Sequence, residues 1–399
     1  MTSANDPTIV LAGETHAPGA PAPAGGIPLA TPDIGPLERA AVVDALDSGF
    51  VSSVGPAVGD FEREFAEVVG SRFAVACSSG TAALHVALRV LDVGPGDEVA
   101  CSDFTFVGSS NPIAYQGART LLIDSEADTW NMSPELLHAE LSRRAAAEEP
   151  QPKCVELVHV LGQPAKADEI LDVCRQFSIP VIEDAAESLG AGWSTGLLAG
   201  RQTGSVGLLG CFSFNGNKIA TAGGGGMVVT DDPLLAQRVR HLTTQAKVPD
   251  VGYLHDEVGY NYRLTNLAAA LGRAQLSRLT DFVEAKRAIA GRYDDAFADL
   301  PLVLPPRLPG HDATYWLYSV LLRDAAERGP FLDHLGAHGV GARALWRPLH
   351  RQPPFASSAL VGGAVADDLF DRGVSLPCST HLTGVDQARV IDAVRSYFG

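Results

Sequence analysis

Basic residues are scarce in this chain of 399 residues, where 30 lysines and arginines stand against 47 aspartates and glutamates for a formal net charge of −17. Such an excess of negative charge argues against nucleic acid or an anionic membrane surface as a partner, although a local basic pocket could still bind phosphate. Long apolar runs are also missing, since none reaches the roughly 18 residues that span a bilayer. We therefore expect a cytoplasmic protein without a membrane segment.

Cysteine motifs and a secretion signal are absent as well. The six cysteines form no CxxC pair and no His/Cys spacing typical of a metal site, so we expect reduced thiols, mostly in the core, and no bound metal. Residues 1–26 are rich in alanine, proline and glycine but lack a basic stretch followed by an apolar one. We interpret them as a flexible leader, with folded structure beginning near Ile27.

The remainder of the chain alternates apolar strand patterns with helical ones. This alternation is typical of parallel strands covered by helices on both faces. The expected strands are 73–77, 98–101, 119–123, 154–160 and 180–183. A long helix is expected from Asn266 to beyond Ala290, followed by strand 315–322 and by helices 331–338 and 387–397. We predict an α/β fold, with a large domain around a mixed, mostly parallel sheet over residues 27–275 and a smaller α+β domain over residues 276–399.

One lysine stands in unusual surroundings. Lys218 lies between the aromatic stretch Cys211–Phe214 and four consecutive glycines, Gly223–Gly226. Glycine lets the backbone come close to a bulky partner, and a lysine held there is suited to lose its proton and attack a carbonyl, as Schiff-base lysines do. The alternative is a glycine-rich hairpin whose lysine faces water. The glycines lack the GxGxxG spacing that precedes a helix in NAD enzymes.

Three further motifs fall where predicted strands end, the edge at which open α/β sheets bind ligands. Residues 79–81 open a helix whose free amides favour a phosphate, or they form a simple N-cap. Asp184 and Glu187 follow a buried strand, where Asp184 is suited to keep a ring nitrogen protonated, or they interact with a helix dipole. Phe106 offers a face to a planar ring, or fills the core. With the lysine, these are the four parts of a pyridoxal phosphate site.

On these motifs the chain resembles the DegT/StrS-type sugar aminotransferases, a branch of the fold-type I pyridoxal phosphate enzymes, from about Ile27 to Phe398. The resemblance implies an aspartate aminotransferase-like fold and a homodimer whose sites are built from both chains. It also implies that Lys218 binds the cofactor aldehyde and moves protons, and that Asp184 pairs with the pyridinium. The other implied cofactor contacts are Gly80, Thr81 and Ser213 for the phosphate, Phe106 for ring stacking, Glu187 near the phenolic oxygen, and Asn261 for the phosphate in the neighbouring subunit.

Finer features indicate one branch of the family. Segments 47–55, 183–190, 213–218 and 345–350 are similar to aminotransferases of bacillosamine and legionaminic acid pathways. Those enzymes aminate C4 of a UDP-linked 4-keto-6-deoxy-2-acetamido sugar, usually with L-glutamate as the donor. The candidates for contacts with the nucleotide sugar are Trp346, His350 and His159, with packing at the domain junction as the alternative role.

Other activities remain possible on the same fold. One alternative substrate is another keto sugar, or a cyclitol, of antibiotic biosynthesis. A pyridoxal phosphate-dependent sugar dehydratase is disfavoured because that branch typically replaces the lysine by histidine, whereas this chain has Lys218. A regulator that binds the cofactor without turnover is disfavoured by the complete set of Lys218, Asp184 and Ser213.

Overall fold

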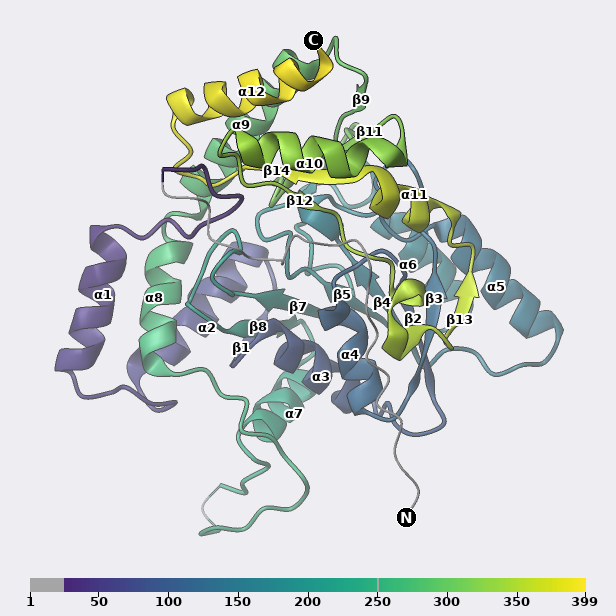
Figure 1. Ribbon diagram of the computed structural model, residues 1–399. Helices are drawn as coiled ribbons and strands as arrows, with labels where there is room; N and C mark the ends of the chain where they lie inside the picture. Colours follow the sequence, from purple (N-terminus) through teal and green to yellow (C-terminus); the bar gives the residue numbers. More distant parts are fainter. Residues whose placement is uncertain (1–24, 250) are drawn as a thin grey trace, which may run out of the picture.

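A large sheet forms the centre of the computed structural model, which describes residues 25–249 and 251–399 (Figure 1). The predicted leader therefore lies, apart from its last two residues, outside the described residues. Eight strands of the described chain form the sheet. In order across it they are β1 (Phe73–Cys77), β8 (Gly226–Thr230), β7 (Leu209–Ser213), β5 (Val181–Asp184), β4 (Cys154–Val158), β2 (Glu98–Ser102), β3 (Arg119–Ile123) and β13 (Ala359–Val361). The strands from β7 to β13 are parallel, and β8 is antiparallel to both of its neighbours.

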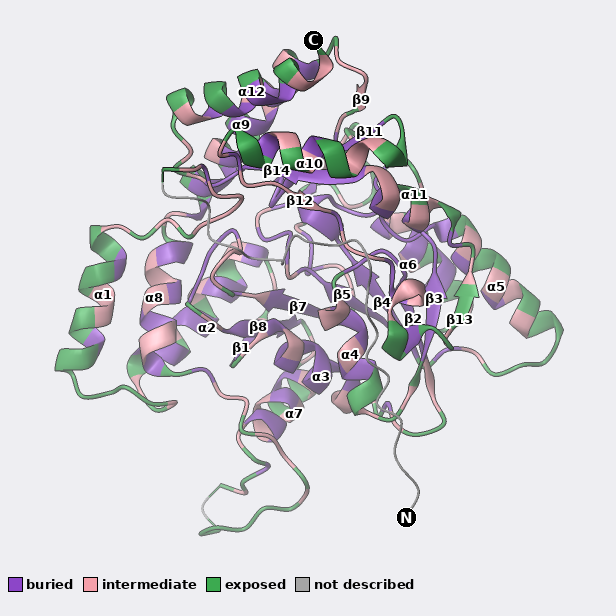
Figure 2. Ribbon diagram, viewed as in Figure 1, coloured by how far each residue is buried: buried purple, intermediate pink, exposed green. Residues whose placement is uncertain are grey.

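Helices cover both faces of this sheet, which accounts for the nearly continuous apolar sequence of its strands. One face is covered by α3 (Gly80–Val90), α4 (Val107–Tyr115) and α7 (Pro233–Thr243). The other is covered by α2 (Pro56–Val69), α5 (Pro134–Ala146), α6 (Ala167–Gln176) and α8 (Asn266–Leu276). The strands are consequently buried between two helical layers (Figure 2). The helix α1 (Pro36–Asp47) packs against α8 at the side of the molecule.

A second, smaller sheet lies above the first in Figure 1. Its strands, all antiparallel, are β12 (Arg343–Ala344), β14 (Gly373–Leu376), β11 (Tyr318–Leu322) and β9 (Leu302–Val303). One face packs on α9 (Leu279–Phe297), α10 (Arg328–Ala337) and α12 (Gly384–Phe398). The opposite face meets the large domain, because Leu321 and Leu345 belong to a core cluster shared with it. A short ladder between β6 (Gly192–Trp193) and β10 (His311–Asp312) joins the two regions, and α11 (Ala364–Arg372) follows β13.

The predicted α/β fold is confirmed, and most predicted strands agree with the structure to within two residues. The long helix predicted from Asn266 onward is wrong in one respect, because it is two helices, α8 and α9. Arg278, between them, leaves helical geometry where its guanidinium binds Asp33 and Glu38 from the start of the described chain. Strand 315–322 also begins later than predicted, at Tyr318.

The division into domains at residue 275 stays a prediction, and several pairings cross it: Ile27 with Val340, β10 with β6, and β13 with β3. β13 comes from the last tenth of the sequence, yet it pairs with β3 at the edge of the large sheet. Single turns of 3-10 helix precede it along the chain, at Val160–Gly162, Ala325–Glu327, Leu349–Arg351 and Pro353–Phe355. Among the described residues, no helix combines the length and apolar character that a bilayer crossing needs.

Candidate active site

Lys218 lies in the loop between β7 and β8, at the end of the large sheet that faces the small domain. The loop folds back on itself through hydrogen bonds from the Phe214 amide to the Gly225 carbonyl (2.9 Å) and from the Ala222 amide to the Phe214 carbonyl (3.0 Å). The lysine amine is only slightly exposed, 3.5 Å from Glu187 Oε1 and 4.0 Å from the centroid of the Trp316 ring. This amine therefore does not face open water, contrary to the hairpin alternative.

Asp184 ends β5 and is buried, as the sequence indicated. Its Oδ2 accepts a hydrogen bond from Ser109 Oγ (2.8 Å) and its Oδ1 accepts one from the Ala186 amide (3.0 Å). Burial raises the pKa of the Asp184 carboxyl, while these donors and the charge of Lys218 act in the opposite direction. A buried carboxylate of this kind is stabilised when a cation lies against it.

Glu187 is the direct neighbour of the lysine amine. Its Oε2 accepts a hydrogen bond from the Leu161 amide (2.8 Å), which fixes the carboxyl with Oε1 toward Lys218. Burial raises the pKa of Glu187 to about 7, although the charge of Lys218 works against that rise. A carboxyl that titrates near neutral pH is suited to exchange a proton with an adjacent amine.

The residues predicted to cradle a phosphate meet where α3 begins against the end of β7. The Ser79 side chain caps this helix by accepting from the Ala82 amide (3.0 Å), and the first-turn amides, including those of Gly80 and Thr81, have no partners within a helix. Ser213, the last residue of β7, packs directly against this turn. A Cβ atom at residue 80 would lie 2.7 Å from that of Ser213, so the close approach requires glycine. The free amides and dipole at the start of α3 thus lie beside the Ser213 hydroxyl.

Aromatic rings form one side of the site. Phe106, the residue before α4, is 53% exposed and lies 6.3 Å, between ring centroids, from Trp346. Trp346 stacks on Trp316 at 5.9 Å with an interplanar angle of 23°. Trp316 also donates from Nε1 to the Asn217 carbonyl (2.6 Å). This bond ties the small domain to residues 214–225 between β7 and β8, which we call the lysine loop. An exposed ring face at Phe106 fits a stacking role better than a core role.

The structure separates the three candidate substrate residues. Trp346 faces the site through its aromatic neighbours, whereas His159 is completely buried. The Ala165 amide donates to His159 Nδ1 (3.1 Å), so Nε2 carries the proton and donates to Glu183 (2.9 Å). Both nitrogens of His159 are thereby engaged, as expected for packing under the site. His350 is partly exposed and its Nδ1 lies 2.6 Å from the buried Asp103.

Asn261 lies apart from the other cofactor candidates. It is exposed, and its Oδ1 accepts from Gln245 Nε2 (3.0 Å) at the base of a loop that extends below the large domain in Figure 1. We call residues 244–262, apart from residue 250, the projecting loop. The structure does not bring Asn261 together with Gly80, Thr81 and Ser213 through any contact within one chain.

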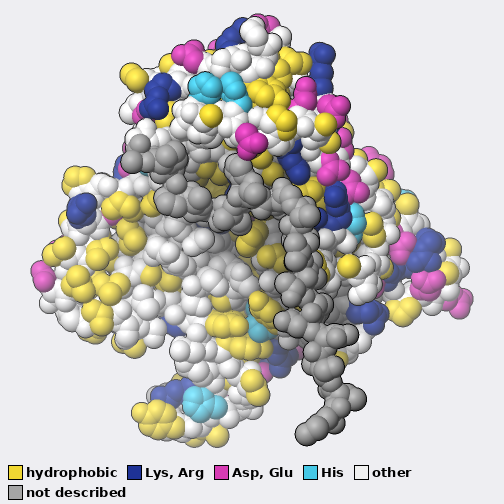
Figure 3. Space-filling view, viewed as in Figure 1, with side chains coloured by type: hydrophobic (Ala, Val, Ile, Leu, Met, Phe, Trp, Pro, Cys, Tyr) yellow, Lys and Arg dark blue, Asp and Glu magenta, His cyan; other side chains and the backbone are white. Residues whose placement is uncertain are grey.

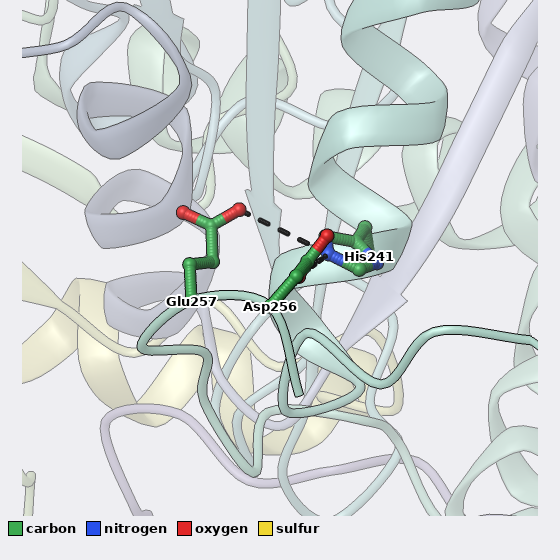
Figure 4. A group of neighbouring side chains, drawn as sticks. All are labelled: His241, Asp256 and Glu257. Atoms are coloured by element: carbon green, nitrogen blue, oxygen red, sulfur yellow. Dashed lines mark hydrogen bonds and ion pairs between the residues drawn. The ribbon is translucent and has the colours of Figure 1, made fainter. Parts of the chain in front are cut away.

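Acidic residues and a histidine also meet at the base of the projecting loop (Figure 4). His241 Nε2 lies 2.7 Å from Asp256 Oδ1 and 3.9 Å from Glu257 Oε1. Both oxygens of Glu257, however, receive hydrogen bonds from Arg238, and Arg89 lies 3.4 Å away. Because arginines already balance Glu257 and His241 pairs with Asp256, the cluster is an ion-pair network that fixes the loop to α7.

Two residues of the site were not found from the sequence. Ser109, which binds Asp184, follows Phe106 by three residues, so the helical period of α4 could have indicated it. Trp316 has no local signal, because it reaches Lys218 only through the packing of the small domain on the large one.

The residues present fit pyridoxal 5'-phosphate. The Asn217 side-chain oxygen, next to the lysine, is buried without a hydrogen-bond partner in the described chain, as expected of a ligand site. The helix start with Ser213 supplies donors for a phosphate, Asp184 a carboxylate for the pyridine nitrogen, and Lys218 an amine for the aldehyde. No other part of the described chain gathers this donor set.

Comparisons with known proteins agree with this assignment. The model of the DegT/DnrJ/EryC1/StrS aminotransferase family matches residues 32–395. EpsN of Bacillus subtilis (strain 168) is 42% identical over 93% of this chain and 95% of its own length, and the GDP-perosamine synthase of Caulobacter vibrioides is 37% identical over 92% and 97%. The crystal structure of a DegT DnrJ EryC1 StrS aminotransferase from Brucella abortus superimposes with a TM-score of 0.85 at 29% identity, covering 91% of this chain and 95% of that one.

These matches confirm the resemblance to DegT/StrS-type sugar aminotransferases. They span almost the whole described chain, and the residues required by the chemistry converge in the structure. The protein therefore belongs to the DegT/DnrJ/EryC1/StrS aminotransferase family, and its cofactor is pyridoxal 5'-phosphate.

Proposed function

We propose that the protein transfers the amino group of L-glutamate to C4 of a UDP-linked 4-keto-6-deoxy-2-acetamido sugar. The observation that carries the proposal is the placement of Lys218 between Glu187 and Trp316, with Asp184 buried nearby. The sequence of the segments 183–190, 213–218 and 345–350 supports the choice of sugar. The GDP-perosamine synthases among the relatives support a nucleotide-linked sugar as the substrate class.

The chain's own residues have distinct parts in this reaction. Bound pyridoxal phosphate supplies an aldehyde and a ring that withdraws electrons. Asp184, held by Ser109, would keep a proton on the ring nitrogen. Lys218 Nζ would hold the aldehyde and, when released, would take a proton from one carbon and return it to another. Glu187, whose pKa is about 7, exchanges protons with that amine at neutral pH.

The residues around the Lys218 amine restrict the access of water to it. Trp316 covers Lys218 from the small-domain side, and its hydrogen bond to the Asn217 carbonyl holds the cover in place. The start of α3 and Ser213 would bind the phosphate, and Phe106 would stack on the ring. Exclusion of water strengthens each of these charge interactions.

A homodimer with shared sites is part of the proposal. The projecting loop exposes the apolar residues Val251, Tyr253, Leu254 and Val258, with Tyr253 and Val258 at least 80% exposed. Hydrophobic side chains gather at the foot of the molecule in Figure 3, over this loop. Apolar surface of this kind marks an interaction site. A second copy of the chain would cover the loop and receive Asn261 near its own phosphate cradle.

The proposal is tested by incubating the cofactor-loaded protein with L-glutamate and UDP-, GDP- or dTDP-linked 4-keto sugars. We expect release of 2-oxoglutarate and, by mass spectrometry, a 4-amino sugar formed fastest from the UDP-linked 2-acetamido substrate. Lys218→Ala is the matched control and should form neither product. Preference for a GDP- or dTDP-linked sugar would refute the choice of nucleotide, and no 2-oxoglutarate with any substrate would refute glutamate-dependent transamination.

A further inference from the structure

A row of polar residues crosses the inner face of the small sheet. The register pairs Arg343 of β12 with Ser375 of β14, and Ser375 with Ser319 of β11. Paired residues in neighbouring strands point to the same face of a sheet. The next residues along, Ala344, Val374 and Val320, point the other way, and the two valines enter the core under α9, α10 and α12. Arg343, Ser375 and Ser319 therefore face the large domain.

Arg343 is a partly buried cation with no direct partner. Within the described chain its guanidinium makes no hydrogen bond or ion pair, whereas Ser375 and Ser319 hydrogen-bond to each other (2.8 Å). Burial lowers the pKa of Arg343, and the charge of Glu187 opposes that effect. In a chain of net charge −17, an arginine left unpaired at such a position indicates an anionic ligand.

The large-domain residues opposite this row belong to the active site. Ser319 and Leu161 line the same small cavity between the two domains, and the Leu161 amide donates to Glu187, the neighbour of the Lys218 amine. The Arg343 guanidinium also lies near enough to Glu187 for the charge of that carboxyl to act on its pKa.

Two anions take part in the proposed reaction, and their chemistry differs in one decisive respect. The α-carboxylate of an amino acid is bonded directly to the carbon that loses the amino group. The diphosphate of a nucleotide sugar is attached at C1, across the ring from C4. A guanidinium coupled to Glu187 is therefore suited to the α-carboxylate, which it can bind with two parallel hydrogen bonds.

We infer that Arg343, with the Ser375 and Ser319 hydroxyls beside it, binds the α-carboxylate of the amino donor. The inference rests on the proposed transamination from an amino acid. Arg343 then selects between the two substrates that share the site, because it engages the donor and leaves the keto sugar to other residues.

The test compares wild type, Arg343→Lys, Arg343→Met and the surface control Arg389→Met, which removes an arginine paired only with Asp386 on α12. The half-saturating concentration of L-glutamate is measured from the change in visible absorbance of the loaded enzyme. The Kd of 2-oxoglutarate is measured by calorimetry, without turnover. We expect Arg343→Met to weaken the binding of L-glutamate and of 2-oxoglutarate by about 10- to 100-fold, as for loss of a charge-assisted hydrogen bond. Arg343→Lys should weaken the binding of both compounds by less. Arg389→Met should match wild type.

Two donor analogues make the assignment specific. L-glutamine keeps the α-carboxylate, whereas L-isoglutamine carries an amide in its place. Wild type should prefer L-glutamine, and Arg343→Met should lose that preference while its half-saturation for the keto sugar stays within about twofold of wild type.

The outcomes separate the inference from the function. Unchanged affinity for L-glutamate and 2-oxoglutarate in Arg343→Met would overturn the inference while transamination stands. A loss confined to the keto sugar would assign Arg343 to the diphosphate instead. Wild type that takes no amino group from L-glutamate would refute the function, and the calorimetric Kd values of the variants would still decide what Arg343 binds.

Discussion

The lysine loop and the projecting loop both carry predicted cofactor contacts, but they are built in opposite ways. Lys218 is enclosed by Glu187 and Trp316, and its loop is fastened by backbone hydrogen bonds. Asn261 is exposed, at the base of a loop whose apolar side chains are left exposed by the described part of the chain. One chain is thus sufficient to position the reactive amine, whereas the proposed contribution of Asn261 depends on the proposed second chain.

Lys218→Ala is expected to have the largest effect, because it removes the one amine that the described residues enclose beside Glu187 and Trp316. Transamination should fall by ~10³-fold or more, and the visible absorbance of the loaded protein should be lost. Both are measured after dialysis against pyridoxal phosphate. The exposed Lys153→Ala serves as the control. Retention of ordinary rates by Lys218→Ala would show that the enclosure of this lysine has no catalytic meaning.

Asp184→Asn should come next, since it keeps the shape of the side chain and removes its charge. We expect kcat to fall by about 10²- to 10³-fold, as for loss of a buried group that stabilises charge in the reaction. Ser109→Ala, which removes only the hydrogen bond to Oδ2, should cost less. If steady-state kinetics gave equal kcat values for Asp184→Asn and wild type, Asp184 would have no part in holding the ring proton.

Mixing an impaired variant with an inactive one sharpens the contrast between the loops. Asn261→Ala should lower activity about tenfold, through loss of a hydrogen bond to a charged group. When Asn261→Ala is refolded together with Lys218→Ala, hybrid dimers contain one site with both residues intact, so activity should rise above the mean of the separate variants. Tyr253→Asp, on the same loop, should halve the mass found by sedimentation. Additive activities would show that both residues serve one site within a single chain.

Glu187→Gln should have the smallest effect, visible as pH dependence of stability in the cofactor-free protein. The folded state raises the pKa of Glu187 from an ordinary 4.5 to about 7, so it binds the proton more tightly than the unfolded state does. The wild type therefore has this stabilisation below about pH 4.5 and loses it as pH rises through 7. The free energy of unfolding of Glu187→Gln, measured in urea relative to wild type, should increase by on the order of 1–3 kcal/mol from pH 5 to pH 8. A difference in free energy of unfolding between variant and wild type that stays constant from pH 5 to pH 8 would contradict the raised pKa of Glu187.

The sequence predicted the parts of the fold and site that depend on neighbours along the chain. The strand that ends at Asp184, the helix that begins at Gly80 and the loop that holds Lys218 all have local signals in turn residues and apolar runs. These three segments meet because parallel strands bring their ends to one edge of a sheet.

Contacts between distant segments could not be predicted in the same way. The break between α8 and α9 has no glycine or proline to mark it, and it lies at Arg278, which forms ion pairs with residues 33 and 38. Trp316 and Arg343 reach the site only through the docking of the small sheet on the large one. His159 was a candidate for contacts with the nucleotide sugar, yet its burial and both of its hydrogen bonds depend on segments folded around it.

The pairing of β13 with β3 has a consequence for synthesis of the protein. Every other strand of the large sheet is complete once Thr230 has been made, but the edge of β3 stays open until Val361 has left the ribosome. At about 5–20 residues per second, that interval is on the order of ten seconds. An uncovered strand edge is a template for pairing with other chains. Nascent chains that stall between these two points are therefore expected to aggregate through β3, and a chaperone that covers this edge should increase the yield of soluble protein.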